Sequence, residues 1–153
     1  MIALALVAAL LVVASHATSS IQSVKRVNGT YALGYFLLDA FISEQQHQNA
    51  VTSYLNITSL GAKNDLSAAA LLAFSDDNWP PSNSTNCRSV VKSANFALSL
   101  TKITRQIAAN GVFSVGLANV KRDTVWFFAV SDCIANAVNQ FFWTATFTTL
   151  SNN

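Results

Sequence analysis

The sequence predicts an all-α fold, a single-domain helical bundle of four to five helices. Two observations favour this class: apolar residues recur at helical spacing in the long stretches of the chain, and residues 123–150 have its densest aromatic content. On a helix, the apolar residues of that last stretch share one face: Phe127, Val130, Ile134, Ala137, Val138, Phe141 and Ala145. We therefore expect the bundle to be organised around residues 123–150.

The N-terminus has the pattern of a secretory signal peptide. An apolar run precedes Ser15 and Ala17, which are small residues at the two positions that signal peptidase reads. The run is shorter than the roughly 20 residues of a membrane-spanning helix. We predict a signal peptide over residues 1–17, a single domain over residues 18–153, and a secreted, extracellular protein. The alternative is that residues 1–17 form a buried first helix.

The first long helix of the mature chain is expected over residues 28–60. Apolar residues share one face in both of its halves, but the polar residues 44–49 interrupt that face. A bend there is therefore as consistent with the pattern as one continuous helix. Gly61 suits the C-cap position, because glycine adopts the left-handed conformation without steric cost.

A short alanine-rich helix is expected next, over residues 66–74, with Asp65 as its N-cap. The following segment, residues 75–86, contains Pro80 and Pro81 among several turn-forming residues. Proline lacks the backbone N–H that helix interiors and central strands require. We therefore predict a loop over residues 75–86.

The rest of the chain is expected to form two more helices with an ambiguous segment between them. Residues 87–110 have a broad apolar side and a polar side, and Gly111 ends this helix. Residues 111–122 fit a helix or a strand equally well. Residues 125–130 alone resemble a strand, but the helical period continues to Ala145, so we predict a helix.

Cys87 and Cys133 are the only cysteines of the chain. In a secreted protein, two cysteines most simply form a disulfide with each other. Such a bond would join two of the predicted helices and would stabilise the fold by roughly 4 kcal/mol, because it closes a long loop. Two free buried thiols are the alternative. The sequence has no C-x-x-C motif, which argues against redox or zinc chemistry.

Charged residues are scarce, at 10% of the chain with a net charge of +2, against about a quarter in a typical protein. The basic residues are dispersed, with adjacent pairs only at Lys25-Arg26 and Lys121-Arg122, and aromatic residues do not alternate with them. We therefore expect no nucleic-acid partner; the first pair also fits a dibasic processing site. Because little charge repulsion opposes association, the composition is compatible with a homo-oligomer.

Three Asn-x-Ser/Thr sequons, at Asn28, Asn56 and Asn83, predict N-glycosylation. Asn83 lies in the proline-containing loop and Asn28 at a helix start, and both positions are accessible in the predicted fold. Asn56, near a helix end, is the less favourable site. Glycans would supply the solubility that the sparse charge does not.

Patterns that resemble catalytic or metal sites are each incomplete. Glu44 and His47 have the Glu-x-x-His spacing of di-iron bundles, but the chain has no second glutamate. Residues 111–116 lack the spacing of a G-x-S-x-G nucleophile motif. Asp76 and Asp77 are adjacent, and adjacent carboxylates seldom converge on one substrate bond. We therefore expect no enzyme activity, no cofactor and no metal.

Trp79 and Trp143 are predicted to be exposed and to form a contact surface. Trp79 precedes two prolines, and Trp143 projects away from the apolar stripe of the last helix. That helix is not expected to anchor the chain in a membrane, because an aspartate near its centre, Asp132, costs about 2.5–3.5 kcal/mol on insertion.

Two functions are compatible with these features. The first is a secreted helical glycoprotein that binds an apolar small molecule or lipid in its bundle, since the predicted core is rich in aromatic residues and alanine. The second is a non-enzymatic interaction or structural glycoprotein, inhibitor-like or self-associating, that acts through Trp79 and Trp143. The predicted domain resembles plant invertase and pectin methylesterase inhibitors in shape only; their N-terminal cysteine pair is missing here, so no residue role is transferred.

Overall fold

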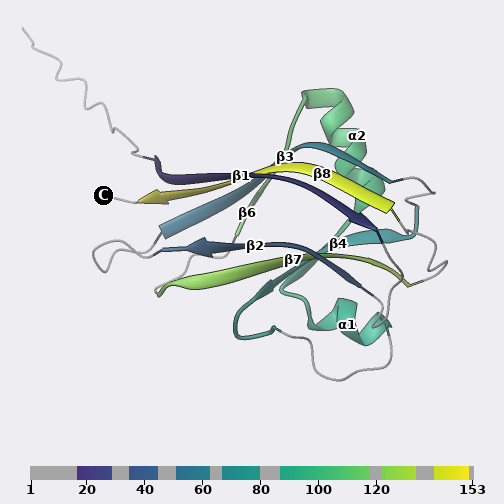
Figure 1. Ribbon diagram of the computed structural model, residues 1–153, viewed down its shortest axis with the longest axis horizontal. Helices are drawn as coiled ribbons and strands as arrows, with labels where there is room; N and C mark the ends of the chain where they lie inside the picture. The colour runs from purple at the N-terminus through teal and green to yellow at the C-terminus, as the bar shows by residue number, and fades with distance from the viewer. Residues whose placement is uncertain are drawn as a thin grey trace, which may run out of the picture.

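Antiparallel strands build most of this protein, so the predicted all-α bundle is wrong. The computed structural model describes residues 17–28, 35–44, 51–62, 67–79, 87–117, 122–133 and 140–151. Within these ranges the chain forms eight strands and two short helices. The strands make two four-stranded sheets that pack face to face as a β-sandwich (Figure 1).

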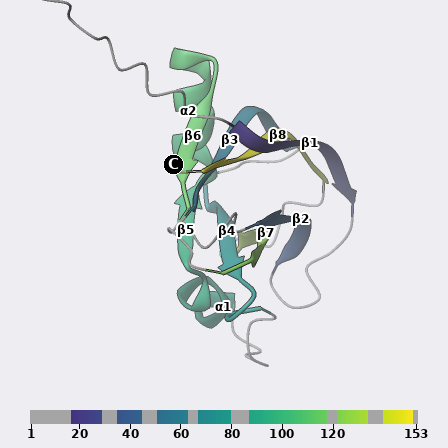
Figure 2. The ribbon, with the colours of Figure 1, turned by 90° about the vertical axis from the view of Figure 1, so that its left-hand side faces the viewer.

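Within each sheet, every pair of neighbouring strands is antiparallel. Sheet A has the order β1 (Ala17–Asn28), β8 (Gln140–Ser151), β3 (Val51–Ala62) and β6 (Phe113–Gly116). Sheet B has the order β2 (Phe36–Ser43), β7 (Thr124–Asp132), β4 (Ala69–Ser75) and β5 (Phe96–Ser99). Figure 2 shows the two layers nearly end-on.

Two helices flank the sandwich. α1 (Cys87–Ser93) lies on the outer side of sheet B, and α2 (Leu100–Asn110) runs along one edge, where it connects β5 of sheet B to β6 of sheet A (Figure 2). α2 buries Leu100 and Ile103 in the core. Gly111 ends α2 as the sequence predicts: it has a left-handed φ of 77°, and its N–H donates to the Ile107 carbonyl at 2.7 Å.

Aromatic rings from both sheets fill the space between them. The buried positions of β8 alternate along the strand: Phe141, Trp143, Ala145, Phe147 and Thr149. Phe147 stacks on Phe41 of sheet B with ring centroids 5.2 Å apart. Phe128 of sheet B is tilted against both Phe41 and Trp143, at 5.9 Å in each case. The core is therefore an interlocked layer of rings, each contact joining residues from distant parts of the chain.

The helix predicted over residues 123–150 is wrong: this stretch contains β7 and β8. In β8, Trp143 and Phe147 are buried whereas Phe142 is exposed. Buried and exposed side chains therefore alternate, as they do in a strand that has one face in the core and the other in solvent. β7 misled the helical interpretation because it is apolar on both faces. It buries Phe128 against sheet A and Ala129 beneath α1, and a continuous apolar run fits any period.

The other helix predictions are also wrong in whole or in part, for a related reason. Residues 28–60 contain β2 and β3, residues 66–74 contain β4, and the ambiguous residues 111–122 contain the strand β6. Residues 87–110 do contain helix, as α1 and α2, but β5 separates them. Alanine-rich β4 is a strand because it pairs with β5 on one side and β7 on the other. Pairing with distant segments overrides a weak local helix preference.

A chain of buried hydroxyl groups links the two sheets. Ser43 Oγ of β2 lies 2.6 Å from Ser53 Oγ of β3, which in turn lies 3.2 Å from Thr149 Oγ1 of β8. All three residues are buried. The hydrogen bonds therefore satisfy polar groups that burial would otherwise leave without partners, and they tie sheet B to the two central strands of sheet A.

The N-terminal predictions concern residues that the structure largely leaves out. Residues 1–16 lie outside the described ranges, and β1 begins at Ala17. The signal peptide over residues 1–17 and the single domain over residues 18–153 stay predictions. Within the described residues, neither helix is long and apolar enough to span a bilayer.

Candidate functional site

A pocket lies between α1 and the outer face of sheet B. Its volume is about 340 Å³, which is at the lower end of the usual range for ligand pockets. We call it the α1 pocket, and its lining consists of Ala68, Ala70, Arg88, Val91, Lys92, Ser131 and Cys133.

Small side chains on sheet B create this hollow. Ala70 of β4 and Ser131 of β7 are cross-strand partners, and both line the pocket. The next pair with the same orientation, Leu72 and Ala129, instead packs against Val90 of α1 in a small apolar cluster. The pocket therefore forms where the outer face of sheet B changes from large to small side chains, while α1 still covers it.

The disulfide Cys87–Cys133 holds α1 over the hollow, and the predicted pairing of the two cysteines is confirmed. It joins a helix to the end of a strand rather than two helices, with the Cα atoms 5.5 Å apart. Ser131 Oγ lies 3.0 Å from Cys87 Sγ and 3.5 Å from Cys133 Sγ. Since α1 has only seven residues, and helices this short are unstable by themselves, the disulfide keeps this wall of the pocket in place.

Two cationic side chains line the same pocket. Arg88 and Lys92 are four residues apart on α1, so they project from the same side of the helix. Both are exposed. The alanines, Val91 and the disulfide supply the apolar part of the lining. An apolar floor beneath two positive groups is chemically suited to a molecule with an apolar body and an anionic head.

An aromatic cluster covers another part of the outer face of sheet B. Trp79 stacks on Phe127 with centroids 4.8 Å apart, and it meets Phe74 at 5.4 Å and Tyr35 at 5.6 Å edge to face. Burial raises the pKa of the Tyr35 hydroxyl. Trp79 is half-buried, so only part of its indole is available to a partner.

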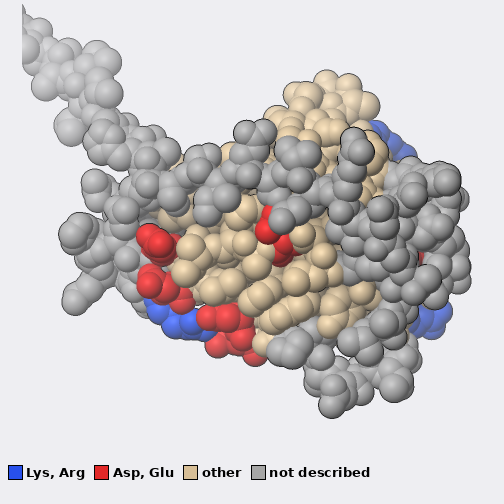
Figure 3. Space-filling model, in the orientation of Figure 1, with Lys and Arg blue, Asp and Glu red and all other residues tan. Residues whose placement is uncertain are grey.

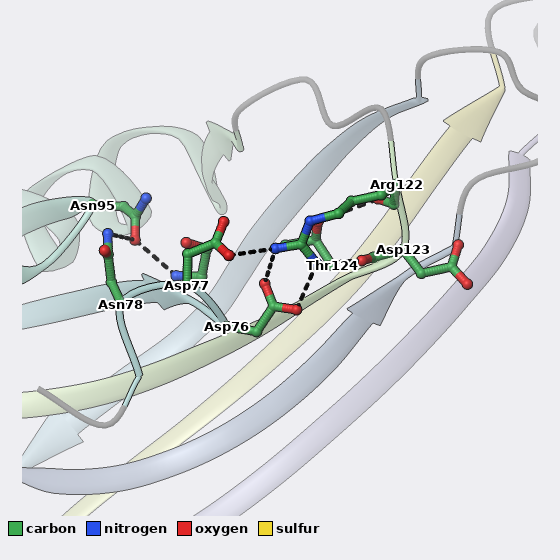
Figure 4. Close-up of polar contacts among 8 residues, drawn as sticks. Asp76, Asp77, Asn78, Asn95, Arg122, Asp123 and Thr124 are labelled. Carbon is green, nitrogen blue, oxygen red and sulfur yellow. Dashed lines mark hydrogen bonds and ion pairs between the residues drawn. The ribbon is translucent and has the colours of Figure 1, made fainter.

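A separate polar cluster joins the end of β4 to the start of β7 (Figure 4). The Arg122 guanidinium donates to both carboxylate oxygens of Asp76, at 2.8 and 2.9 Å, and to Asp77 Oδ1 at 2.7 Å. It also donates to the Asp123 carbonyl at 3.0 Å. On the face drawn in Figure 3, the charged side chains of described residues gather mainly at the left, with a further acidic group near the upper centre and basic groups at the right.

Asn95 orders the turn that carries these aspartates (Figure 4). Its Oδ1 accepts the Ser75 N–H at 2.7 Å and the Asn78 side-chain amide at 3.1 Å. Its own N–H donates to the Ala73 carbonyl at 2.8 Å. Asn95 thereby continues the hydrogen bonding of β4 beyond Ala73, the last residue that pairs with β5. This cluster is a structural clamp between two loops, because one guanidinium holds both carboxylates.

The clamp predicts a pH-dependent stability. The hydrogen bond from Arg122 lowers the pKa of Asp76, so this carboxylate stabilises the native state above its unfolded pKa of about 3.9. That contribution is lost as the pH falls through the lower, folded pKa. We expect Arg122→Met to lower the melting temperature modestly at pH 7, because both groups are partly exposed. The difference from wild type should shrink as the pH falls below about 4.

Melting temperatures measured by circular dichroism across this pH range test the clamp. Arg105→Met, which removes an exposed arginine from α2, is the matched control. Its difference from wild type should not vary in the same way with pH. Parallel curves for Arg122→Met and wild type would show that the Asp76 ion pair does not contribute.

The structure contradicts one predicted contact residue. Trp143 is fully buried between the sheets, so its predicted exposure is wrong. The error follows from the helix assignment. The helical period puts Trp143 on the polar face of the predicted helix, whereas the alternation of β8 puts it on the face that packs against sheet B. Trp79 keeps a partial exposure, and the two indoles do not form one surface.

The sequons lie in different settings, and glycosylation stays a prediction at all three. Asn28 is the last residue of β1, Asn56 lies within β3 on the outer side of sheet A, and Asn83 is outside the described residues. The predicted helical settings of Asn28 and Asn56 are wrong, since both are in strands.

The incomplete catalytic patterns are not brought together as sites. Glu44 is exposed after β2, and His47 lies outside the described residues. Asp76 and Asp77 both contact Arg122, and residues 111–116 form the cap of α2 and β6. Within the described parts of the chain, no three His, Cys, Asp or Glu side chains are placed to hold a metal ion.

Sequence reasoning missed Arg88 and Lys92 as candidate binding residues. Their spacing directly after Cys87 was visible, and it places them on one side of a helix. What the spacing could not indicate is the hollow beside them, which depends on β4 pairing with β7. The sequence matches no protein-family model, and no curated protein is similar to it. Fold and pocket together define a class: a disulfide-linked antiparallel β-sandwich with a cationic, partly apolar surface pocket.

Proposed function

We propose that this protein binds a small amphiphilic anion in the α1 pocket. The observation that carries the proposal is the joint presence of an apolar floor and the two cations Arg88 and Lys92 in one hollow. We also propose that it acts outside the cell as a glycoprotein. The predicted signal peptide and sequons support this location, and a disulfide is typical of oxidising compartments.

The two parts of the pocket would contribute differently to binding. Burial of an apolar body against Ala70 and Val91 supplies affinity of about 25 cal/mol per Å² removed from water. A carboxylate, sulfonate or phosphate head would accept hydrogen bonds from Lys92 and from Arg88, which also interacts within the protein, and exposed ion pairs contribute about 0.2–1 kcal/mol each. The cations would therefore supply selectivity for anions over neutral molecules of the same shape.

The proposed pocket replaces the predicted bundle interior as the place of binding. Core aromatics such as Phe41, Phe128 and Phe147 contact one another across the sheets. A ligand between the sheets would have to displace them from close packing. The outer face of sheet B requires no such displacement.

Calorimetric titration with three straight-chain probes tests the proposal: octanoate, octanol and octylammonium. We expect octanoate to bind severalfold more tightly than octanol, because exposed ion pairs contribute about 0.2–1 kcal/mol each, and octylammonium to bind most weakly. Arg88→Glu with Lys92→Glu should reverse the order of the two charged probes. Lys102→Glu with Arg105→Glu on α2 makes the same change in net charge away from the pocket and should preserve the wild-type order.

The apolar part of the site has its own variant. Ala70→Leu fills the floor of the pocket and should abolish binding of octanoate and octanol alike. Equal affinity of wild type for octanoate and octanol, or unchanged octanoate binding by Arg88→Glu with Lys92→Glu, would disprove the proposal.

The alternative, an interaction or structural glycoprotein that acts through a tryptophan surface, ranks second. Of its two residues, Trp79 alone is at the surface. Trp79→Ala should abolish self-association or capture of a partner in this alternative and should leave octanoate binding unchanged. A non-enzymatic role without a cofactor stays our expectation for both functions.

A further inference from the structure

The outer face of sheet A is a second surface with its own chemistry. The described outward-facing residues of β3, β6 and β8 are uncharged, and most of them bear a hydroxyl group. They include Thr52, Tyr54, Asn56, Thr58, Ser114, Gly116, Phe142, Thr144, Thr146, Thr148 and Leu150. The wet face of an antiparallel sheet carries polar side chains, and on these three strands hydroxyl and amide groups supply that polarity.

Asn56 lies near the middle of this face, in the sequon Asn56-Ile57-Thr58. Its strand β3 pairs with β8 on one side and with β6 on the other. Asn56 Oδ1 accepts the hydroxyl of its cross-strand partner Ser114 at 2.6 Å. This hydrogen bond uses Oδ1 and leaves the amide nitrogen Nδ2, the atom that a glycan would modify, without a bond to Ser114.

Thr58, which completes the sequon, is exposed at an irregularity of the strand. The pairing register with β8 shifts between Ile57 and Ser59, which places Thr58 in a β-bulge. Its hydroxyl lies 3.4 Å from the Thr144 carbonyl. Asn56 is half-buried and Thr58 is exposed, so both side chains are accessible from the outer side.

Tyr54 places an aromatic ring next to Asn56. Two residues apart on a strand, the two side chains share a face. Tyr54 lies opposite Gly116 of β6, where a Cβ atom would be 3.6 Å from Tyr54 Cε1. The ring therefore packs against the backbone of Gly116, and because Tyr54 is half-buried, part of the ring is accessible to a ligand. Apolar C–H faces of sugars pack on such rings.

We propose that Asn56 carries an N-linked glycan whose first sugar packs on Tyr54, and that this glycan covers the outer face of sheet A. In the transfer, Nδ2 bonds to the anomeric carbon of a lipid-linked oligosaccharide. The bond from that carbon to the lipid diphosphate breaks, the diphosphate leaves with the electron pair, and the amide loses one proton to a base of the transferase. Since β6 and β8 follow Asn56 in the chain, transfer can precede their pairing with β3.

The proposal depends on entry into the secretory pathway and is independent of the α1 pocket. The full chain is therefore expressed in eukaryotic cells behind an added secretory leader and with a C-terminal tag that contains a reporter sequon. Glycopeptide mass spectrometry then measures occupancy at Asn56 and at the reporter. We expect most reporter-modified molecules to carry a glycan at Asn56 and none to do so in Asn56→Gln. Reporter-modified protein with Asn56 largely unmodified would overturn the proposal.

The contact between sugar and Tyr54 is tested by thermal melting before and after enzymatic trimming of the glycan. In wild type, removal of the glycan should lower the melting temperature by about 2–4 °C, which corresponds to roughly 1 kcal/mol for a chain of this size. The loss should disappear in Tyr54→Ala and persist in Tyr54→Phe, which keeps the ring. An equal loss in Tyr54→Ala and wild type would disprove the role of Tyr54, whatever the variant does to stability itself.

Discussion

Trp143→Ala should lower the free energy of unfolding by about 3–5 kcal/mol, the usual cost of removing a large aromatic side chain from a packed core. Trp143 is 0% exposed, and its ring lies 5.9 Å from that of Phe128 in the opposite sheet. On the predicted helix this side chain would have projected into water, where truncation costs little. Urea denaturation followed by far-ultraviolet circular dichroism measures the effect.

Phe142→Ala is the matched control, one residue earlier on the same strand. Phe142 is 46% exposed and rests over Gly61, where a Cβ atom would lie 2.5 Å from its ring. Its removal should cost less than about 1.5 kcal/mol, because nearly half of the residue already contacts water. Similar losses for Trp143→Ala and Phe142→Ala would contradict the alternation of β8.

Trp143→Phe separates packing from hydrogen bonding. The indole N–H of Trp143 is buried and has no partner among the described residues. An unpaired buried donor costs about 1–3 kcal/mol, so phenylalanine removes this penalty while keeping most of the aromatic volume. We expect Trp143→Phe to cost much less than Trp143→Ala. A loss as large as that of alanine would show that the N–H is hydrogen-bonded in the native protein.

Removal of the disulfide is the second change with a large expected effect. Cys87 and Cys133 are 46 residues apart, and closing a loop of this length stabilises the native state by about 4 kcal/mol on the chain-entropy model. Typical domains have a total stability of about 5–15 kcal/mol. Cys87→Ala with Cys133→Ala should therefore shift the urea midpoint strongly downward and release α1 from sheet B.

Reductant supplies the control for this prediction. A reducing agent should destabilise the wild type by a similar amount and leave the double variant unchanged. Because α1 is one wall of the α1 pocket, octanoate affinity should fall in both destabilised forms even where they remain folded. Retention of full affinity without the disulfide would show that Val90 and its neighbours alone hold α1 in place.

The site could be anticipated only in part. The cysteine count predicted the pairing that anchors α1, because two cysteines in a chain that is predicted to be secreted most simply pair with each other. Helical spacing could have placed Arg88 and Lys92 together. The floor of the pocket could not be anticipated, since Ala70 and Ser131 are neighbours only through the pairing of β4 with β7.

The ion pairs of the clamp could not be predicted from the sequence for the same reason. Asp76 and Asp77 were visible as an isolated acidic pair, and Arg122 as one of a basic pair. Their ion pairs join positions 46 and 45 residues apart. Nothing in the local sequence indicates which distant charge a loop residue will contact.

By itself, the sequence determined the features that depend on local chemistry or on simple counting. Glycine ends α2 because it alone adopts a left-handed φ without steric cost, and the two cysteines pair. Tertiary structure decided the fold class. The apolar runs of β4 and β7 suit a helix as well as a strand, and only hydrogen bonding between segments far apart in the chain selects the strand. The same pairing decided which tryptophan is buried and where a hollow remains for a ligand.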